Sequence, residues 1–208
     1  MILSSNAASG SPSLMRCGTG CSELTLRPAR READDAFMIM VRRLTESDWR
    51  TYRDLLLECL RVAPYSARLT YDQAALRTEL QWQAKLTESV LFGAWLDDVP
   101  VGLAGGKLDG ELPELVSMWV DPVARGKGTA DELVRAVLDW ARDGGYGQVM
   151  LWVLDGNEPA ERVYLRNGFR RTGRREAMER DAAMVQVEMV LDLGSTGQGS
   201  KSQAAQQM

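Results

Sequence analysis

Apolar residues follow two different periods along the chain between residues 40 and 193. Strand-like runs occupy 40–45, 89–95, 99–106, 114–120 and 148–154, and a closing pair of strands ends near residue 193. Helical spacing occupies 46–62, 71–85, the stretch after residue 128, and 157–169. The order is strand, two helices, three strands, helix, strand, helix, two strands. It predicts a single α/β domain.

The two ends differ from this middle part in composition. Residues 1–39 are rich in Ser, Gly and Ala at "NAASGSPS", and residues 194–208 read "GSTGQGSKSQAAQQM". We expect a disordered N-terminal extension over 1–39, a folded domain over 40–193 and a flexible tail over 194–208. Because we find no secretory h-region and no apolar run near the membrane length of about 20 residues, we expect a cytoplasmic protein without a membrane partner.

Composition narrows the possible chemistry. Hydrophobic residues make up 45% of the 208 residues, and the net charge is -4, which argues against a nucleic-acid partner. The basic stretch "RNGFRRTGRRE" at 166–176 could contact nucleic acid, but we interpret it as a solvated hairpin face. The chain has no histidine and three cysteines, Cys17, Cys21 and Cys59. Histidine-based catalysis and histidine-ligated metal sites are therefore excluded, and we assign no cysteine a nucleophilic role.

The segment "VDPVARGKGTADELVRAVLDWA", residues 120–141, joins a strand end, a glycine loop and an amphipathic helix. A helix N-terminus offers unpaired N–H groups and a partial positive charge, and glycines let an anion approach them closely. The loop does not fit a Walker A motif, which would need a glycine at Asp121. It does not fit a dinucleotide fingerprint either, because Asp131 occupies the third glycine position. Phosphate binding and a plain surface turn both remain open from this loop alone.

A second motif strengthens the phosphate-binding interpretation. Arg125, Gly128 and Ala130 fit the pattern Q/R-x-x-G-x-G/A, and "NEPAERVYLRNGF" at 157–169 fits N-x-x-A-x-x-x-Y-x-x-x-G-F. Together, in this order, they resemble the coenzyme A loop and the following helix of the GNAT superfamily of N-acetyltransferases. The resemblance implies a GNAT fold, with a mixed central sheet of about six to seven strands flanked by about four helices. It also implies acetyl-CoA as cosubstrate and no metal.

The resemblance assigns a cofactor site. Backbone N–H groups from Arg125 to Ala130 would hold the pyrophosphate, while the preceding strand would splay from its parallel neighbour to pair with the pantetheine arm. Asn157 would contact the cofactor, cap a helix, or do both. The implied cofactor-binding residues are Met118, Trp119, Val120, Arg125, Gly126, Lys127, Gly128, Thr129, Ala130, Asn157 and Tyr164.

The resemblance also assigns catalytic roles for direct transfer without an acyl-enzyme. Tyr164 matches the family's general acid, since a phenol with a pKa of about 10 stays protonated near neutrality; a buried core aromatic is the alternative. Glu114 matches the base of one branch of the family, with a solvated strand-edge glutamate as the alternative. Ser117 and ordered water compete with Glu114 as base. The backbone N–H of Val120 would stabilise the oxyanion.

The acceptor is the least determined feature. It would be shaped by the loops around 61–88, 106–113 and 171–181. Asp109, Glu111 and Glu114 suit a small cationic amine, and a protein lysine or N-terminus is the second enzymatic interpretation. A GNAT-like module that senses acyl-CoA without turnover is a third. Dimers are frequent in this family, so the partners that the resemblance implies include a second copy of the chain in a homodimer.

Overall fold

A computed structural model of the chain describes residues 37–64, 69–110, 112–179 and 181–194. The strands are β1 Ile39–Arg43, β2 Val90–Leu96, β3 Val99–Asp109, β4 Leu112–Val120, β5 Gln148–Leu154, β6 Arg170–Met178 and β7 Asp181–Asp192. The α-helices are α1 Trp49–Val62, α2 Tyr71–Ala75, α3 Glu79–Glu88, α4 Thr129–Asp143 and α5 Glu158–Arg166, with 3-10 turns η1 Glu46–Asp48 and η2 Pro122–Ala124.

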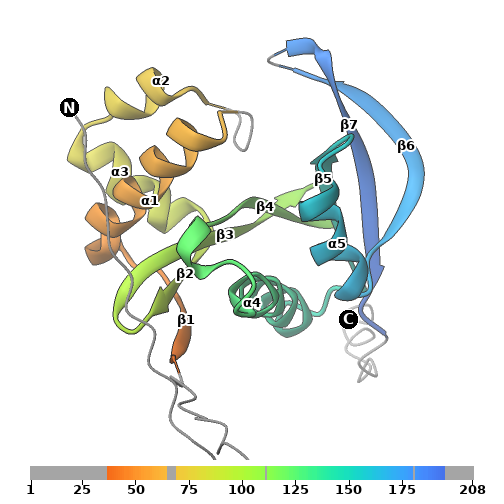
Figure 1. The fold of residues 1–208 in the computed structure, drawn as a ribbon, viewed down its shortest axis with the longest axis horizontal. Helices are drawn as coiled ribbons and strands as arrows, with labels where there is room; N and C mark the ends of the chain where they lie inside the picture. The colour runs from red at the N-terminus through yellow and green to blue at the C-terminus, as the bar shows by residue number, and fades with distance from the viewer. Residues whose placement is uncertain (1–36, 65–68, 111, 180, 195–208) are drawn as a thin grey trace, which may run out of the picture. The chain divides into compact units, whose positions relative to one another are not determined.

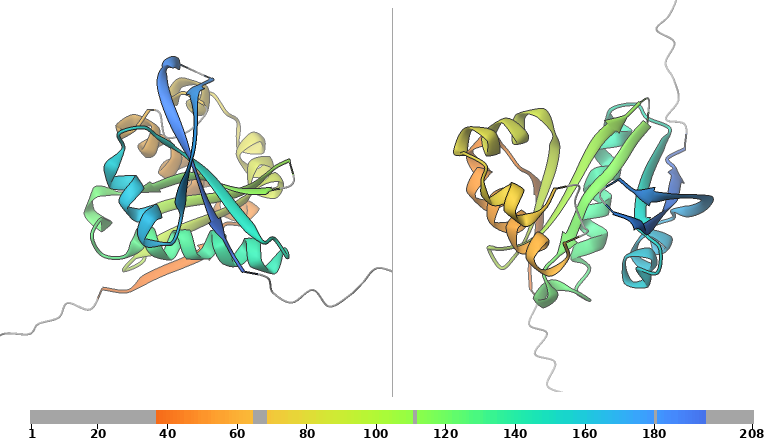
Figure 2. Two further views of the ribbon diagram at one scale, coloured as in Figure 1. Left: turned by 90° about the vertical axis from the view of Figure 1, so that its right-hand side faces the viewer. Right: turned by 90° about the horizontal axis from the view of Figure 1, so that it is seen from above.

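The strands form one mixed sheet in the order β1-β2-β3-β4-β5-β7-β6. Every neighbouring pair is antiparallel except β4 and β5, which run parallel. Helices α1 to α3 lie on one side of β2 to β4, and α4 lies on the other with α5 beside it (Figures 1 and 2). The expected α/β class is confirmed, and the mixed sheet has seven strands where about six to seven were expected, with five α-helices where about four were expected. The expected end segments 1–39 and 194–208 lie outside the described residues, apart from 37–39 and 194.

Helix α4 packs its predicted apolar stripe against the sheet. The stripe is fully buried and consists of Leu133, Val134, Val137, Leu138 and Ala141. Gly106 on β3 makes this close approach possible, because a Cβ there would lie 2.3 Å from Cζ3 of Trp140. The helix is therefore held against the sheet along its length, which fixes where its N-terminus points.

The prediction of a single helix over residues 71–85 is wrong. Two helices, α2 and α3, occupy this region, and Leu76 and Leu80, which were expected on an apolar face, are 83% and 76% exposed. Thr70 and Thr78 each begin a new helix by a capping box, with Gln73 and Gln81 three residues later. The repeated T-x-x-Q spacing is the signal that divides the segment, and it overrides the apolar periodicity.

The hairpin expected around Asp97 and Asp98 is confirmed, and both residues adopt positive φ, 49° and 68°. Asp tolerates this left-handed region better than most residues, which suits a tight hairpin. At the other end of the domain, β6 and β7 form a long hairpin that reaches past the rest of the sheet (Figure 1, blue). No helix among the described residues is long and apolar enough to cross a membrane.

Candidate active site

The parallel strands β4 and β5 are joined over a short distance only. Glu114 pairs with Met150 and Leu115 with Leu151, after which no further pair forms. The cause lies on the other edge of β4, where a bulge sets Ser117 and Met118 opposite the single residue Ala104. Ser117 has a φ of 54°, and a bulge of this kind bends its strand. The backbone of β4 beyond Leu115 is therefore left unpaired toward β5, as the expected splay requires.

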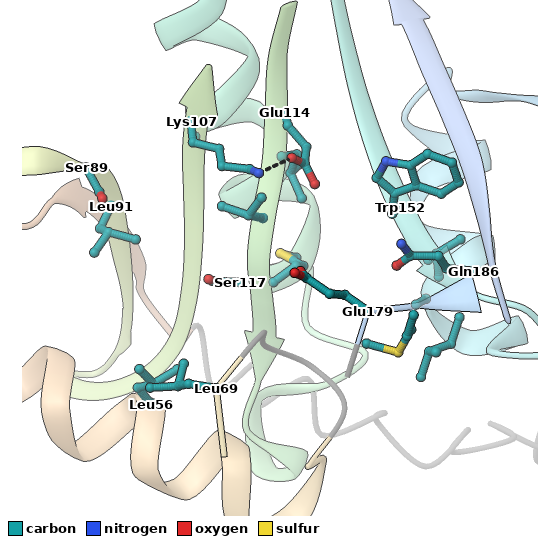
Figure 3. A pocket seen from close by; sticks show the side chains of 18 of the residues that line it. Leu56, Leu69, Ser89, Leu91, Lys107, Glu114, Ser117, Trp152, Glu179 and Gln186 are labelled. Atoms are coloured by element: carbon teal, nitrogen blue, oxygen red, sulfur yellow. Dashed lines mark ion pairs between the residues drawn. The ribbon is translucent and has the colours of Figure 1, made fainter. Parts of the chain in front are cut away.

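A cavity of about 920 Å³ opens at this divergence. One wall comes from α1, α3 and β2, the floor from β3 and β4, and the opposite wall from β5, α5 and the end of the β6–β7 hairpin (Figure 3). Four of the expected site residues line it: Glu114, Met118, Asn157 and Tyr164. Ser117, the competing base, lines it as well. The volume lies within the range of about 300–1,000 Å³ usual for small-molecule sites.

The glycine loop lies directly before α4. Gly126 and Gly128 have φ of 74° and 91°, and no heavy atom lies within 4 Å of a Cβ built on either. In the described part of the chain, the backbone N–H groups of residues 126–130 donate to no protein acceptor, whereas those of Asp131 and Glu132 donate to the Gly128 carbonyl. Five consecutive donors at a helix N-terminus with open space around the glycines suit a phosphate group. The residues present therefore fit the pyrophosphate of coenzyme A.

Neighbouring side chains hold the loop in place. Thr129 is buried, and its hydroxyl donates to the Ala124 carbonyl at 3.1 Å, while Nε of Arg125 donates to the Val120 carbonyl at 3.1 Å. Nζ of Lys127 lies 5.1 Å from the centre of the Phe37 ring. Each of these contacts ties a loop side chain to the protein, which leaves the backbone as the open surface of the loop.

The start of α4 is also clamped to the end of α5. Asp131 accepts from Nε and Nη2 of Arg166 at 2.7 and 2.8 Å, and from Asn167 at 2.6 Å. The hydrogen bond from Arg166 is the main cause that holds the pKa of Asp131 below its usual value, with burial acting in the opposite direction. The loop before α4 and the helix that carries Tyr164 therefore have a fixed relative position.

Tyr164 lies both in the core and at the cavity wall. Its ring is 6% exposed and packs edge-on against Phe169 with 5.9 Å between ring centres. Burial raises the pKa of the phenol, so the hydroxyl stays protonated at neutral pH. That hydroxyl has no hydrogen-bond partner among the described residues. Packing and a proton-donating role are thus compatible at this position.

Asn157 likewise satisfies both interpretations made from the sequence. Its Oδ1 accepts from the Ala160 N–H at 3.3 Å as the cap of α5, and the residue also lines the cavity. Trp119 and Val120 do not line it: Trp119 packs against Leu55 and Cys59, and Val120 packs into the sheet core. Only their backbone can therefore face a ligand in the gap.

Glu114 is not the solvated strand-edge residue of the alternative interpretation, because it is 4% exposed. Its Oε2 lies 2.6 Å from Nζ of Lys107, the residue directly opposite on β3 (Figure 3). The two charges form an ion pair, but the angles fall outside those of a hydrogen bond, so Oε2 has no aligned donor among the described residues. Sequence reasoning missed Lys107, although the register of the β3–β4 hairpin would have placed it opposite Glu114.

Other lining residues also escaped the sequence analysis. They include Tyr52, Arg77, Lys85, Trp152, Glu176 and Gln186. They come from four separate parts of the chain, and no local motif connects them. Their assembly depends on how α1, α3 and the β6–β7 hairpin are placed around β4 and β5.

Curated relatives are named as N-acetylaspartate synthetases or as N-acetyltransferases. N-acetylaspartate synthetase of Rattus norvegicus is 35% identical over an alignment of 136 positions that covers 58% of this chain and 46% of the relative. N-acetyltransferase 8B of Homo sapiens is 41% identical over 113 residues, half of each chain. The chain thus spans about half the length of the curated relatives it matches.

Solved structures share the fold. An acetyltransferase of the GNAT family from Streptococcus pneumoniae superposes with a TM-score of 0.64 at 16% identity, over 76% of this chain and 100% of that one. The yncA protein of Salmonella typhimurium, solved with acetyl-CoA, gives 0.60 at 15% identity, over 79% and 99%. A model of the acetyltransferase (GNAT) family matches residues 43–169, more than half of the chain. This protein therefore belongs to the acetyltransferase (GNAT) family.

Proposed function

We propose that this chain transfers the acetyl group of acetyl-CoA directly to a primary amine. The observation that carries the proposal is the divergence of β4 from β5, which opens a cavity lined by Tyr164, together with the free N–H groups of residues 126–130 in the loop that follows β4. Membership of the family supports it.

The loop and the strand edge would hold the cosubstrate. The N–H groups of residues 126–130 would bind the pyrophosphate, and the unpaired edge of β4 around Met118 would pair with the pantetheine amides. The N–H of Asp121 donates to the Val101 carbonyl at 2.8 Å. Because successive N–H groups of a strand point to opposite edges, the N–H of Val120 points to the edge that β5 has left. This orientation supports Val120 as the donor to the oxyanion.

Acetyl-CoA supplies a thioester whose carbonyl carbon forms the new C–N bond while the C–S bond breaks. The protonated phenol of Tyr164 would donate its proton to the departing sulfur. The amine must lose a proton to a base, for which Glu114, Ser117 and an ordered water remain the candidates. Oε2 of Glu114 is held by Nζ of Lys107 at 2.6 Å, so the acceptor amine would have to displace Lys107 before that oxygen could take its proton.

The test is titration calorimetry of the full chain with acetyl-CoA, with acetyl-pantetheine as a control that lacks the pyrophosphate. Micromolar binding that depends on the pyrophosphate, followed by thiol release with an amine, is the expected result. Failure to bind acetyl-CoA would remove the proposal. Binding without thiol release over a broad panel of amines would instead favour the acyl-CoA-sensing alternative.

A small acceptor is the better supported class. Relatives named for N-acetylaspartate synthesis form a small acetylated product, which favours a small molecule over a protein lysine or N-terminus. The cationic acceptor expected from Asp109, Glu111 and Glu114 has less support, since the charge of Glu114 is already balanced by Lys107. A screen of small amines against peptides ending in free amines or carrying lysine separates the two classes.

A further inference from the structure

Two cations on the wall opposite α5 have no anionic partner among the described residues. Arg77, just before α3, and Lys85, within it, both line the cavity and are partly buried. Neither forms an ion pair in the part of the chain that the structure describes. Both also line a second, shallower depression of about 380 Å³ on the outer side of α3, together with Gln81, Ala84 and Glu88. Their charges are therefore available on one continuous face of this helix.

Arg77 is held in a fixed position by a buried aromatic pair. Its guanidinium lies 5.2 Å from the ring centre of Trp82, which is 1% exposed, and its charge acts on the neighbouring Tyr52, whose pKa it lowers against the larger effect of burial. Tyr52 packs edge-on against Trp82 with 5.5 Å between ring centres. Burial raises the pKa of Tyr52 to about 12, so its phenol stays neutral and does not balance the charge of Arg77. A preorganised guanidinium loses less conformational freedom when it binds an anion.

The other charged residues that line the cavity each have an interaction within the protein. Lys107 pairs with Glu114 at 2.6 Å on the floor. On the opposite wall, Glu176 accepts from Gln186 at 2.9 Å and lies 3.6 Å from Arg174, and Glu179 has a partner of its own. Glu88 lines the second depression together with Lys85, and the two form no ion pair among the described residues. Arg77 and Lys85 are thus the two cations of the cavity wall that form no ion pair in the described part of the chain.

We propose that Arg77 and Lys85 bind a carboxylate of the acceptor, so that the acceptor is an amino acid or another small amine that carries a carboxylate. The inference rests on the proposed function and specifies its acceptor. A guanidinium beside an ammonium is the arrangement that proteins use to bind carboxylates, and partial burial strengthens the interaction. With its carboxylate at α3, the acceptor directs its amine into the same cavity that Ser117 and Tyr164 line.

The test is thiol release by the full chain from acetyl-CoA with matched acceptors. Aspartate, glutamate and alanine are compared with the same amino acids amidated at every carboxyl, and with putrescine and phosphoethanolamine. The acids should exceed their amides at least tenfold in kcat/KM, although amidation makes more of the α-amine neutral. Arg77→Gln and Lys85→Gln should each raise the KM of the acid about tenfold and leave that of acetyl-CoA unchanged.

Arg142→Gln is the matched control, because it removes one exposed positive charge on α4, where Arg142 pairs with Asp139. If Arg77→Gln unfolds through loss of its contacts with Trp82 and Tyr52, Lys85→Gln still decides the question. Equal or better turnover of amides or putrescine, or unchanged KM in the foldable variants, overturns the carboxylate site. A preference for phosphoethanolamine over every amino acid overturns the assignment to a carboxylate.

A binding measurement separates failure of this inference from failure of the proposed function. Glutarate is titrated into the protein while the backbone amide signals of residues 77–85 are followed by NMR. Saturable shifts that disappear in Lys85→Gln support the anion site even if no thiol is released with any amine. Absence of shifts together with no preference for acids overturns it, whether or not acetyl-CoA binds.

Discussion

At the scale of single residues, the proposed chemistry depends on a buried hydroxyl to which no described residue is hydrogen-bonded. Tyr164 is buried against Phe169, yet its hydroxyl has no partner among the described residues, so the packing of the ring and the chemistry of its oxygen can be separated. Few residues allow this separation, because most buried hydroxyls are hydrogen-bonded to the protein.

Tyr164→Phe should therefore retain the fold and lose catalysis. We expect kcat to fall about 100-fold or more, because the proton for the departing sulfur is lost, while the Kd of acetyl-CoA stays within about twofold. Tyr146→Phe is the control, since Tyr146 packs on Trp140 outside the cavity. Unchanged turnover of Tyr164→Phe, measured by thiol release, would assign Tyr164 to the core alone.

Lys107 is expected to stabilise the fold through Glu114. Lys107→Met leaves a carboxylate that is 4% exposed without a cation, and we expect a loss of about 1–3 kcal/mol in the free energy of unfolding at pH 8. Urea unfolding at pH 8 measures it. Adding Glu114→Gln to Lys107→Met should restore most of the lost stability. If Lys107→Met costs as much with Gln at position 114 as with Glu, the pairing is contradicted.

At the scale of secondary-structure elements, the ends of α4 determine the proposed anion site. Gly128 precedes the helix and Gly145 follows it, with φ of 91° and 77°, and a Cβ at either meets no atom within 4 Å. The two positions share the same backbone strain, but only Gly128 borders the free N–H groups.

Gly128→Ala and Gly145→Ala should thus lower stability alike, by about 1–2 kcal/mol each. Only Gly128→Ala should weaken acetyl-CoA binding, by about tenfold or more, since its methyl group restricts approach to the backbone. Calorimetric titration of both variants checks this. Equal affinities in the two variants would mean that the loop is only a turn.

The clamp between α4 and α5 predicts a pH dependence. The pKa of Asp131 is lowered in the folded state, so the pair contributes stability above the unfolded pKa of about 3.9, and this contribution is lost as pH falls through the folded value. Arg166→Gln should cost about 0.5–1 kcal/mol at pH 7, and the difference from wild type should shrink as the pH falls below the unfolded pKa of about 3.9. Urea unfolding measures both values. Arg162→Gln, which removes an exposed pair with Glu158, should cost less at pH 7.

Local patterns predicted most of these elements. The apolar stripe of α4, the apolar run of β5 and the Pro and Gly that bound α5 act within a few residues, and all three elements appear as expected. The helix over 71–85 was mispredicted because apolar spacing was followed where two threonine caps, Thr70 and Thr78, decide the structure. The pair of Lys107 and Glu114 depends on strand register, which apolar periodicity does not report.

At the scale of the whole domain, the sheet consists of two parts that are joined by few paired residues. Strands β1 to β4 and strands β5 to β7 meet through two paired positions only. The lining residues of the cavity come from elements far apart in sequence, among them α3, β3 and the β6–β7 hairpin. Motifs therefore identified the cosubstrate loop but not the acceptor side. That Arg77 and Lys85 line one cavity is apparent only from the tertiary structure.

A ligand that spans the two parts should stabilise the domain as a unit. Acetyl-CoA at 100 times its Kd should add about 2.7 kcal/mol to the free energy of unfolding and raise Tm by about 5–10 °C. Differential scanning calorimetry measures the shift, and Gly128→Val at the same acetyl-CoA concentration is the control, with a much smaller shift expected. No rise in Tm at saturating acetyl-CoA would contradict a bridging ligand.

The gap between β4 and β5 also bears on aggregation. An unpaired strand edge invites another chain to add a strand, and proteins usually protect such edges. This edge lies inside the sheet, with β5 and α5 across the cavity from it, rather than at the outer strands β1 and β6. An intruding polypeptide would have to bring side chains on both faces into a cavity of about 920 Å³ that is already walled on both sides. A ligand chain that has amides but no side chains meets no such obstacle. The fold thus keeps an unpaired strand edge to which another polypeptide cannot add a strand.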